Sequence, residues 1–253
     1  MVTASRNWVC VRPATYESAE EAEVLLGYFA GRQGTLENTV FALLDSDAKL
    51  ISFRAGRSPG MLYDGPARMA EELTKKGKAV EENERRALPR LGNLRLALNV
   101  AACDSLPLVV AFAETEKERA ALQKRLAPAA WDARLVGETH YVVCEPKELD
   151  AFEALAKSRG EAKSGLLVVQ PDEYGRTATV LSELRIKLEG EPLTEALVTA
   201  VEVHDVEARE HRKHVREGKR QGYEWQGQIP STDPDDDRGG RRERGGRGER
   251  GGR

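Results

Sequence analysis

Three cysteines, Cys10, Cys103 and Cys144, are the residues of this chain that could carry thiol chemistry. They form no close pair, so the sequence predicts no disulfide framework. Cys10 and Cys144 lie in two similar apolar segments, WVCVRP and YVVCEP, where a free cysteine usually behaves as a small buried residue. Cys103 lies in a predicted loop beside Asp104 and is the weak candidate for a catalytic residue. Because a neighbouring carboxylate disfavours the thiolate, we favour an inert thiol there too.

Three of the four histidines, His204, His211 and His214, lie seven and three residues apart. On one continuous helix these offsets share a face, and imidazole nitrogens are common ligands of transition metals. The three residues are therefore weak candidates for a metal site. The alternative is a solvated helix, because lysines and arginines alternate with the histidines and would repel a cation. We favour that alternative, and predict no bound metal and no cofactor.

The last sixteen residues, RGGRRERGGRGERGGR, consist mainly of arginine and glycine. Arginine supplies charge and a planar group that stacks, while glycine lets the backbone follow a strand. The composition predicts weak, salt-sensitive and sequence-independent binding to RNA or single-stranded DNA. The alternative is a solubilising tail that contacts acidic surfaces, because charge fixes attraction but not the partner. The candidate nucleic-acid-binding residues are Arg238, Arg241, Arg242, Arg244, Arg247, Arg250 and Arg253.

Two aromatic residues, Tyr223 and Trp225, precede this tail outside any periodic pattern. Such side chains usually pack back onto the folded body, and they can also form a surface for a partner. The acidic run DPDDD at 233–237 lacks the ligand spacing and the glycine of an EF-hand loop, so we interpret it as a linker. The loop GRSPG at 56–60 lacks the Lys-Ser/Thr ending of a P-loop, so it does not predict nucleotide binding.

The bulk composition of the 253 residues indicates a globular chain with one large or two small domains. Aromatic residues make up only 6%, so the core must consist mostly of Leu, Val and Ala. The net charge is −3, yet the Arg-Gly tail carries +5 and the remainder carries −8. An acidic body with a basic tail indicates two separate roles. The absence of long apolar runs, of a secretory pattern at the start and of paired cysteines predicts a cytoplasmic protein without a membrane span.

Two similar cassettes of secondary structure must position these residues. In the first, a strand is predicted at 8–13, followed by a helix that Ser18 caps together with Glu21. Segments 40–44 and 50–55 then predict a hairpin. Further along the chain, apolar periodicity predicts helices at 66–76, 91–102, 114–126, 149–155 and from 192, strands at 106–112 and 141–144, and a second hairpin at 166–169 and 177–184. A charged stretch at 204–220 extends the last helix.

The predicted order strand–helix–strand–helix–strand–strand–helix over 106–204 resembles a thioredoxin-like domain. Segment 8–76 is similar to the later part of the same fold. The expected fold class is therefore α/β: tandem thioredoxin-like units with mixed central sheets flanked by helices, plus a disordered C-terminal tail. The expected domains are a partial unit at 1–86, a second thioredoxin-like domain at 87–204, a charged helical extension with an acidic arm at 205–237, and the tail at 238–253.

The chain departs from the motifs that this resemblance implies for redox enzymes. Such enzymes carry Cys-x-x-Cys at the start of the first helix, where this chain reads Ala113-Glu114-Thr115-Glu116. They also place a cis-proline just before the hairpin strand, where this chain has no proline at 36–39 or 163–165. The resemblance therefore implies the fold and argues against ordinary dithiol chemistry.

Three functions remain open from the sequence. The first is a non-catalytic thioredoxin-like binding or scaffold protein for a protein partner, whose basic tail makes weak contacts with nucleic acid or an acidic partner. The second is a diverged thiol-disulfide oxidoreductase that uses one cysteine, with Cys103 the best placed. The third is an RNA-associated factor. We favour the first.

Overall fold

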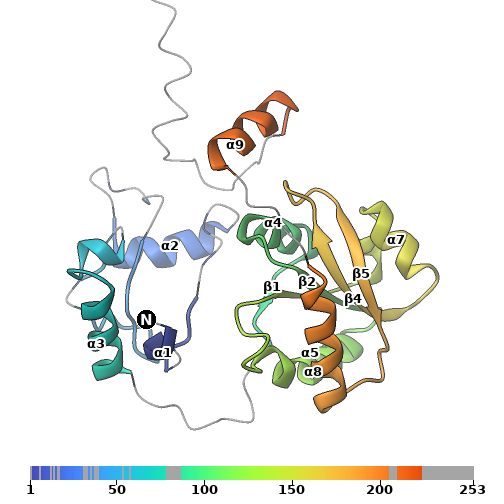
Figure 1. Ribbon diagram of the computed structural model, residues 1–253, viewed down its shortest axis with the longest axis horizontal. Coiled ribbons are helices and arrows are strands. Elements are labelled where there is room, and N and C mark those ends of the chain that lie inside the picture. The colour runs from blue at the N-terminus through green and yellow to red at the C-terminus, as the bar shows by residue number, and fades with distance from the viewer. Residues whose placement is uncertain are drawn as a thin grey trace, which may run out of the picture. The chain divides into compact units, whose positions relative to one another are not determined.

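A computed structural model describes residues 2–5, 7–11, 13, 15, 18–30, 34, 36, 40–52, 54–56, 58–77, 87–204 and 210–223. These residues belong to two compact units, Met1–Glu81 and Glu82–Glu224, which are described separately (Figure 1). Within the described ranges, none of the helices has the length and apolar character needed to cross a membrane. The domain boundary predicted near residue 86 falls in 78–86, outside the described residues.

Helices dominate the described part of the first unit. They are α1 Val2–Ser5, α2 Ala19–Tyr28, the 3-10 helix η1 Pro59–Met61 and α3 Pro66–Lys76. The helix α2 begins at the predicted cap, where the Ser18 hydroxyl accepts a hydrogen bond from the Glu21 amide at 3.3 Å. The helix α3 has the predicted bounds, and Leu73 on its inner face packs in a small core with Ala4 and Leu43.

The strand predicted at 8–13 is wrong, because residues 8–11 and 13 form no regular structure. Trp8 instead packs against the small core of this unit, and its indole nitrogen donates to the Leu73 carbonyl oxygen at 3.0 Å. The bulky indole thus gains partial burial and a hydrogen-bond acceptor at the end of α3, and among the described residues of this unit no strand pairs with it.

The hairpin predicted at 40–44 and 50–55 is only partly formed. Two isolated antiparallel bridges, Phe41 to Gly56 and Leu44 to Leu50, connect its arms. The Asp45 carboxylate closes the turn by accepting the amides of Asp47 and Lys49. The described residues of this unit contain no strand ladder, so they do not show the central sheet that was predicted for it from the sequence.

The second unit is mixed α/β, with a five-stranded mixed sheet flanked by helices (Figure 1). The strand order is β1-β3-β2-β4-β5, in which β1, β3 and β2 run parallel and β4 is antiparallel to both β2 and β5. The strands are β1 Arg90–Leu91, β2 Leu108–Ala113, β3 His140–Cys144, β4 Ser164–Pro171 and β5 Ala178–Leu184. The helices are α4 Leu94–Asp104, α5 Glu116–Ala130, α6 Pro146–Leu149, α7 Glu153–Arg159, α8 Gly190–Glu202 and α9 His211–Arg220.

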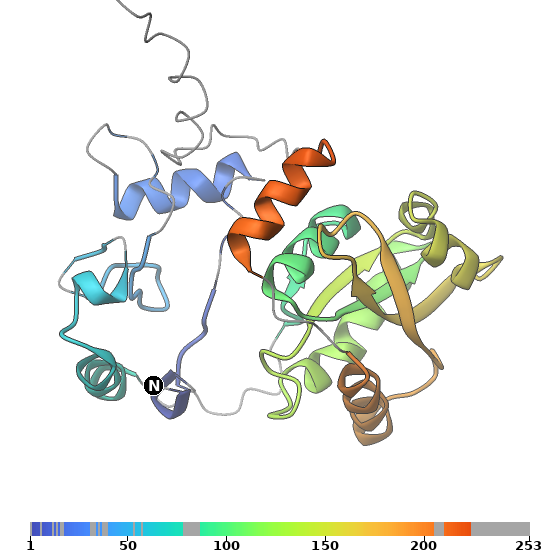
Figure 2. The ribbon, with the colours of Figure 1, turned by 45° about the horizontal axis from the view of Figure 1, so that its top comes forward.

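Side chains of the central strand β2 alternate between two apolar layers. Val110 and Phe112 pack with residues of α4, α6 and α7 on one face of the sheet. Val109 and Ala111 pack with residues of α5 and α8 on the other face. Figures 1 and 2 show α4 and α8 on opposite sides of the sheet. Because both faces are covered, β2 is a continuous apolar run, as expected for a strand buried on both faces of its sheet.

The element order predicted for 106–204 is confirmed in outline, with two corrections. The helix predicted at 149–155 is divided into α6 and α7, because Phe152 adopts an extended backbone between them and packs in the core. The extension of the last helix through 204–220 is also wrong. The helix α8 ends at Glu202, and α9 is a separate helix.

Candidate functional site

The start of α5, where the resemblance noted from the sequence would place a pair of thiols, is closed by a capping box. The Thr115 hydroxyl accepts from the Glu118 amide at 3.3 Å, and the Glu118 carboxylate accepts from the Thr115 amide at 3.2 Å. Donation by the Thr115 hydroxyl and then by its amide lowers the pKa of Glu118. This reciprocal pair satisfies amides that the first helical turn leaves unbonded.

Charged side chains fill the same edge of the sheet, beside that cap. The Arg119 guanidinium donates to the carbonyl oxygens of Ala113 at 2.9 Å and Glu114 at 2.8 Å, and lies 3.5 Å from the Glu145 carboxylate. The Lys163 amine lies 3.3 Å from the Glu114 carboxylate. These groups hold the loops after β2 and before β4, and none of them is a thiol.

The structure separates the three cysteines. Cys144 is the last residue of β3 and is buried, which confirms the core position predicted for it. Burial, followed by the nearby Glu148, raises the pKa of its thiol to about 12. Cys10 is exposed, so the core position predicted for it is wrong. Cys103 is exposed as well, and it lies in α4 rather than in a loop.

Alkylation should distinguish these thiols sharply. With iodoacetamide at pH 8 we expect Cys10 and Cys103 to react promptly in the native protein, and Cys144 only after unfolding. At that pH a thiol with a pKa of about 12 is almost entirely protonated, and the thiolate is the reactive form. Peptide mass spectrometry after timed quenching measures all three sites. Modification of native Cys144 at the rate of Cys103 would contradict this account.

Two histidines bind the end of α4 rather than one another. The His140 Nε2 atom at the start of β3 lies 2.8 Å from an oxygen of Asp104, the last residue of α4. The His204 Nε2 atom lies 3.1 Å from the Ser105 carbonyl oxygen. These contacts fix the loops at the edge of the sheet opposite the capping box. His140, which the sequence did not single out, could have been noticed as the polar first residue of an otherwise apolar strand.

The helix face proposed for a metal site does not exist, because α8 and α9 are separate helices. His204 follows α8, whereas His211 begins α9 and His214 lies within it. Throughout the described ranges, no three His, Cys, Asp or Glu side chains gather closely enough to hold a metal ion. His204, His211 and His214 therefore do not lie on one face of a single helix.

The side chain of Tyr174 docks α9 on the turn between β4 and β5. Its ring stacks on the His214 ring, with a centroid distance of 4.4 Å and an interplanar angle of 10°. Its hydroxyl donates to the His214 carbonyl oxygen at 3.2 Å. Tyr223 meets Tyr174 edge to face at 4.8 Å. This confirms that Tyr223 packs back onto the body, while Trp225 lies outside the described residues.

The turn that presents Tyr174 is tightly built. The Asp172 carboxylate accepts from the amides of Arg176 and Thr177. Gly175 has φ of +62°, and a Cβ atom on it would lie 2.6 Å from the Asn99 Cα atom of α4. Only glycine combines this left-handed conformation with so close an approach to backbone. The backbone of the turn therefore packs closely on α4, and this fixes the place from which Tyr174 contacts α9.

Positive charge gathers around this docked helix. The Arg176 guanidinium lies 4.4 Å from the centre of the Tyr223 ring. Burial and then the charge of Arg176 lower the pKa of Arg95 at the start of α4, and Asp172 offsets part of this effect. α9 itself carries five exposed cations, which are Arg212, Lys213, Arg216, Lys219 and Arg220.

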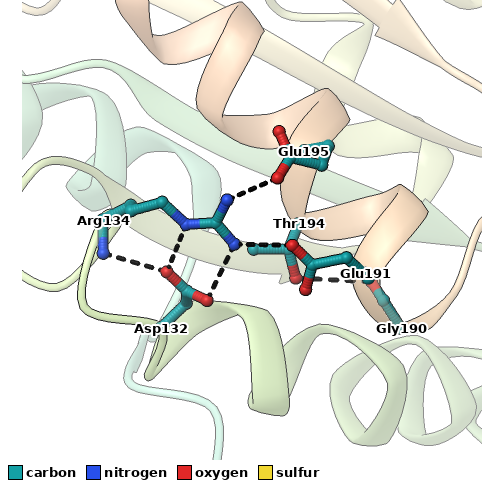
Figure 3. A network of polar contacts seen from close by, with 6 residues as sticks. All are labelled: Asp132, Arg134, Gly190, Glu191, Thr194 and Glu195. Carbon is teal, nitrogen blue, oxygen red and sulfur yellow. Dashed lines mark hydrogen bonds and ion pairs between the residues drawn. The ribbon is translucent and has the colours of Figure 1, made fainter.

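A separate network joins the loop after α5 to α8 (Figure 3). The Arg134 guanidinium donates to Asp132 at 2.8 and 3.0 Å, to Glu191 at 2.9 Å and to Glu195 at 2.5 Å. The three carboxylate acceptors, Asp132 first, raise the pKa of Arg134, and hydrogen bonds from the Arg134 side chain and then from its backbone amide lower the pKa of Asp132 to about 2. All the groups are at the surface, so the network orients the loop and contributes little to stability.

Removal of the guanidinium should be visible in the titration of Asp132. In an Arg134→Gln variant we expect the pKa of Asp132 to rise from about 2 toward its ordinary value of about 3.9. The stabilisation from a lowered pKa is complete above the unfolded value and is lost as the pH falls through the folded value. The difference in unfolding free energy between wild type and the variant should therefore disappear as the pH falls from about 4 to about 2. Carboxyl NMR titration measures this shift, and an Arg185→Gln variant is the control. An unchanged titration of Asp132 in Arg134→Gln would contradict the assignment.

One motif match escaped the prediction from sequence. Residues 56–60, GRSPG, fit the spacing G-x-S-x-G of a nucleophile elbow. Such an elbow places its serine between a strand and a helix, whereas Ser58 precedes the three-residue helix η1. All four histidines of the chain lie in the other unit. The match therefore lacks the strand-to-helix context of an elbow, and its own unit contains no histidine that could serve as the base.

The predicted nucleic-acid-binding arginines lie outside the described residues, so they stay a prediction from sequence. They are Arg238, Arg241, Arg242, Arg244, Arg247, Arg250 and Arg253. The acidic run at 233–237 also lies outside the described residues.

No protein-family model matches the sequence, and a search of curated proteins finds no match. The chemistry of the groups described above therefore carries the functional interpretation.

Proposed function

We propose that this chain is a non-catalytic binding protein built on a thioredoxin-like domain at 87–204. Its Arg-Gly tail makes weak contacts with nucleic acid or with an acidic partner. The element order from β2 to α8 supports the thioredoxin-like fold, because it follows the strand–helix–strand–helix–strand–strand–helix order predicted from the sequence. The mixed sheet covered by helices on both faces supports it further.

The observation that carries the non-catalytic part is the chemistry at the start of α5. There Thr115 and Glu118 cap the helix, and Arg119 saturates the neighbouring carbonyl oxygens. Dithiol exchange needs two thiols at this place, one of them activated as a thiolate. A carboxylate, a hydroxyl and a guanidinium cannot exchange electrons with a disulfide. In this proposal the domain acts by binding, and the tail adds positive charge.

Insulin reduction with dithiothreitol as the electron donor tests this part. We expect the full chain to give the background rate of dithiothreitol alone, and a Cys103→Ser variant to give the same rate. Turnover by the wild-type chain that disappears in Cys103→Ser would overturn the proposal. That result would instead establish the single-cysteine oxidoreductase, for which the exposure of Cys103 is the specific supporting observation.

A further inference from the structure

We propose that the exposed face of α9 is a binding surface for single-stranded nucleic acid, with the phosphate backbone as the ligand. The inference deepens the proposed function, on whose binding role it rests, by placing part of the contact in the folded unit rather than in the tail. It needs no base recognition, so we expect sequence-independent binding of RNA and single-stranded DNA.

The sequence of α9 divides its surface into two opposite faces. At about 100° per residue, His214 and Gly218 lie on one side, where they contact the Tyr174 ring. The five cations fall within an arc of about 120° centred opposite that contact. They are Arg212, Lys213, Arg216, Lys219 and Arg220, and all are exposed. Docking through Tyr174 thus turns every cation of the helix outward.

Three of the five cations have no ion-pair partner within the described residues. Glu217 pairs with Arg220 at 2.8 Å, and Glu173 lies 3.5 Å from the His214 Nδ1 atom on the docked side. Across the part of the chain that the structure describes, Arg212, Lys213 and Arg216 form no ion pair. Gathered like charges repel one another, and a bound polyanion would relieve that repulsion.

The linear density of charge favours a nucleic acid strand. The ten residues of α9 span about 15 Å. Phosphates of one strand follow one another every 3.4 Å or so along the axis of a duplex, and a single strand does not pack them more densely. At most about four phosphates therefore face the five cations of α9. The chain continues from Tyr223 to the first tail arginine, Arg238, over a stretch that spans about 50 Å at most. A strand that leaves α9 can thus reach the tail.

A membrane surface fits α9 less well. Helices that lie on anionic bilayers insert an apolar face between the lipids. The face of α9 opposite its cations is occupied by Tyr174, and Val215 is the exposed apolar side chain of this helix. An acidic protein would meet the charge but would not provide the same density along α9 and the tail together.

The test removes three positive charges from α9 in the full chain, and the control removes three positive charges from other surfaces of the same unit. The α9 variant carries Arg212→Gln, Lys213→Gln and Arg216→Gln. The control carries three changes to glutamine on α5 and the loop after β5, at the exposed residues Lys117, Lys124 and Lys187. Binding of fluorescent oligouridylate and oligothymidylate is measured by anisotropy from about 50 to 200 mM salt. A second variant, Arg212→Lys with Arg216→Lys, keeps the charge.

The expected result is a change in salt dependence. Each lost phosphate contact lowers the slope of log affinity against log salt by about 0.7. The slope of the α9 variant should therefore be smaller by about 2, so that across this salt range the control loses about twentyfold more affinity than the α9 variant. The lysine variant should bind like wild type. Equal slopes for the α9 variant and the control would overturn the inference.

Two further outcomes separate this inference from the proposed function. In the first, deletion of 238–253 weakens binding while the α9 variant binds like the control. That outcome would support binding by the tail and overturn the inference about α9. The inference would also be overturned if the full chain bound polyglutamate or phosphatidylserine vesicles through α9 more strongly than either oligonucleotide. The ligand of α9 would then be an acidic protein or a membrane.

Discussion

Replacement of Phe112 by alanine is expected to lower the free energy of unfolding of the second unit by about 3–5 kcal/mol. The side chain is 1% exposed and lies in the apolar layer between β2 and the helices α4, α6 and α7. Its loss leaves a cavity in a close-packed layer, which neighbouring side chains fill only in part. Urea unfolding followed by circular dichroism measures the change.

A double-mutant cycle with Gly165 makes this prediction specific. Gly165 pairs with Phe112 across β2 and β4, and a Cβ atom on it would lie 2.4 Å from the phenyl ring. Gly165→Ala alone should cost about 1–3 kcal/mol through overpacking. In the Phe112→Ala background the clash is absent, so the same change should cost little or stabilise. Additive effects of the two changes would contradict the described packing, since independent sites add and contacting sites do not.

Replacement of Tyr174 by alanine is expected to release α9. A helix of ten residues is marginal in water by itself, and the clustered cations of α9 oppose it further. Its structure therefore depends on the ring stack with His214 and on the close fit of Gly218 to the Tyr174 ring. Amide hydrogen exchange over 211–220 should accelerate by at least about tenfold, while exchange in β2 and β4 stays as in wild type.

The matched control is Tyr174→Phe. It keeps the ring and its stack, and it loses the hydrogen bond from the hydroxyl to the His214 carbonyl oxygen. We expect exchange in α9 to change much less in this variant than in Tyr174→Ala. Unchanged exchange in Tyr174→Ala would mean that α9 is not held by this ring.

Much of the second unit could be predicted from sequence because its signals are local. The apolar run that becomes β2 is buried on both faces, and the paired segments that become β4 and β5 flank clear turn residues. Capping residues also act within a few positions of one another. Ser18 therefore marked the start of α2 correctly.

The failures share a different cause, since they depended on contacts between distant residues. Residues 8–13 alternate like a strand, yet Trp8 bonds to α3 instead of a ladder. The continuous helix through 204–220 was inferred from charge and histidine spacing. Contacts made by His204 with Ser105, and by His214 with Tyr174, separate the two parts. A local sequence pattern cannot predict these contacts, because the partners lie 99 and 40 residues away in the chain.

The candidate binding surface on α9 could be predicted only in part, for the same reason. Composition identified the basic segments and the aromatic residue Tyr223, but their roles depend on Tyr174, an ordinary turn residue in the sequence. The spacing of the five cations places them on one side of α9, and the contact of Tyr174 with the opposite side makes theirs the outward face. Periodicity alone would have suggested a helix solvated on all sides.

The central claim is that this chain binds a polyanion through its basic segments, and salt-dependent binding of oligouridylate tests it most directly. For the full chain we expect log affinity to fall linearly with log salt. Deletion of 238–253, which removes seven arginines, should make the slope less steep by up to about 5. A slope that is unchanged by the deletion, or no retention of the oligonucleotide by the full chain at about 50 mM salt, would contradict the account.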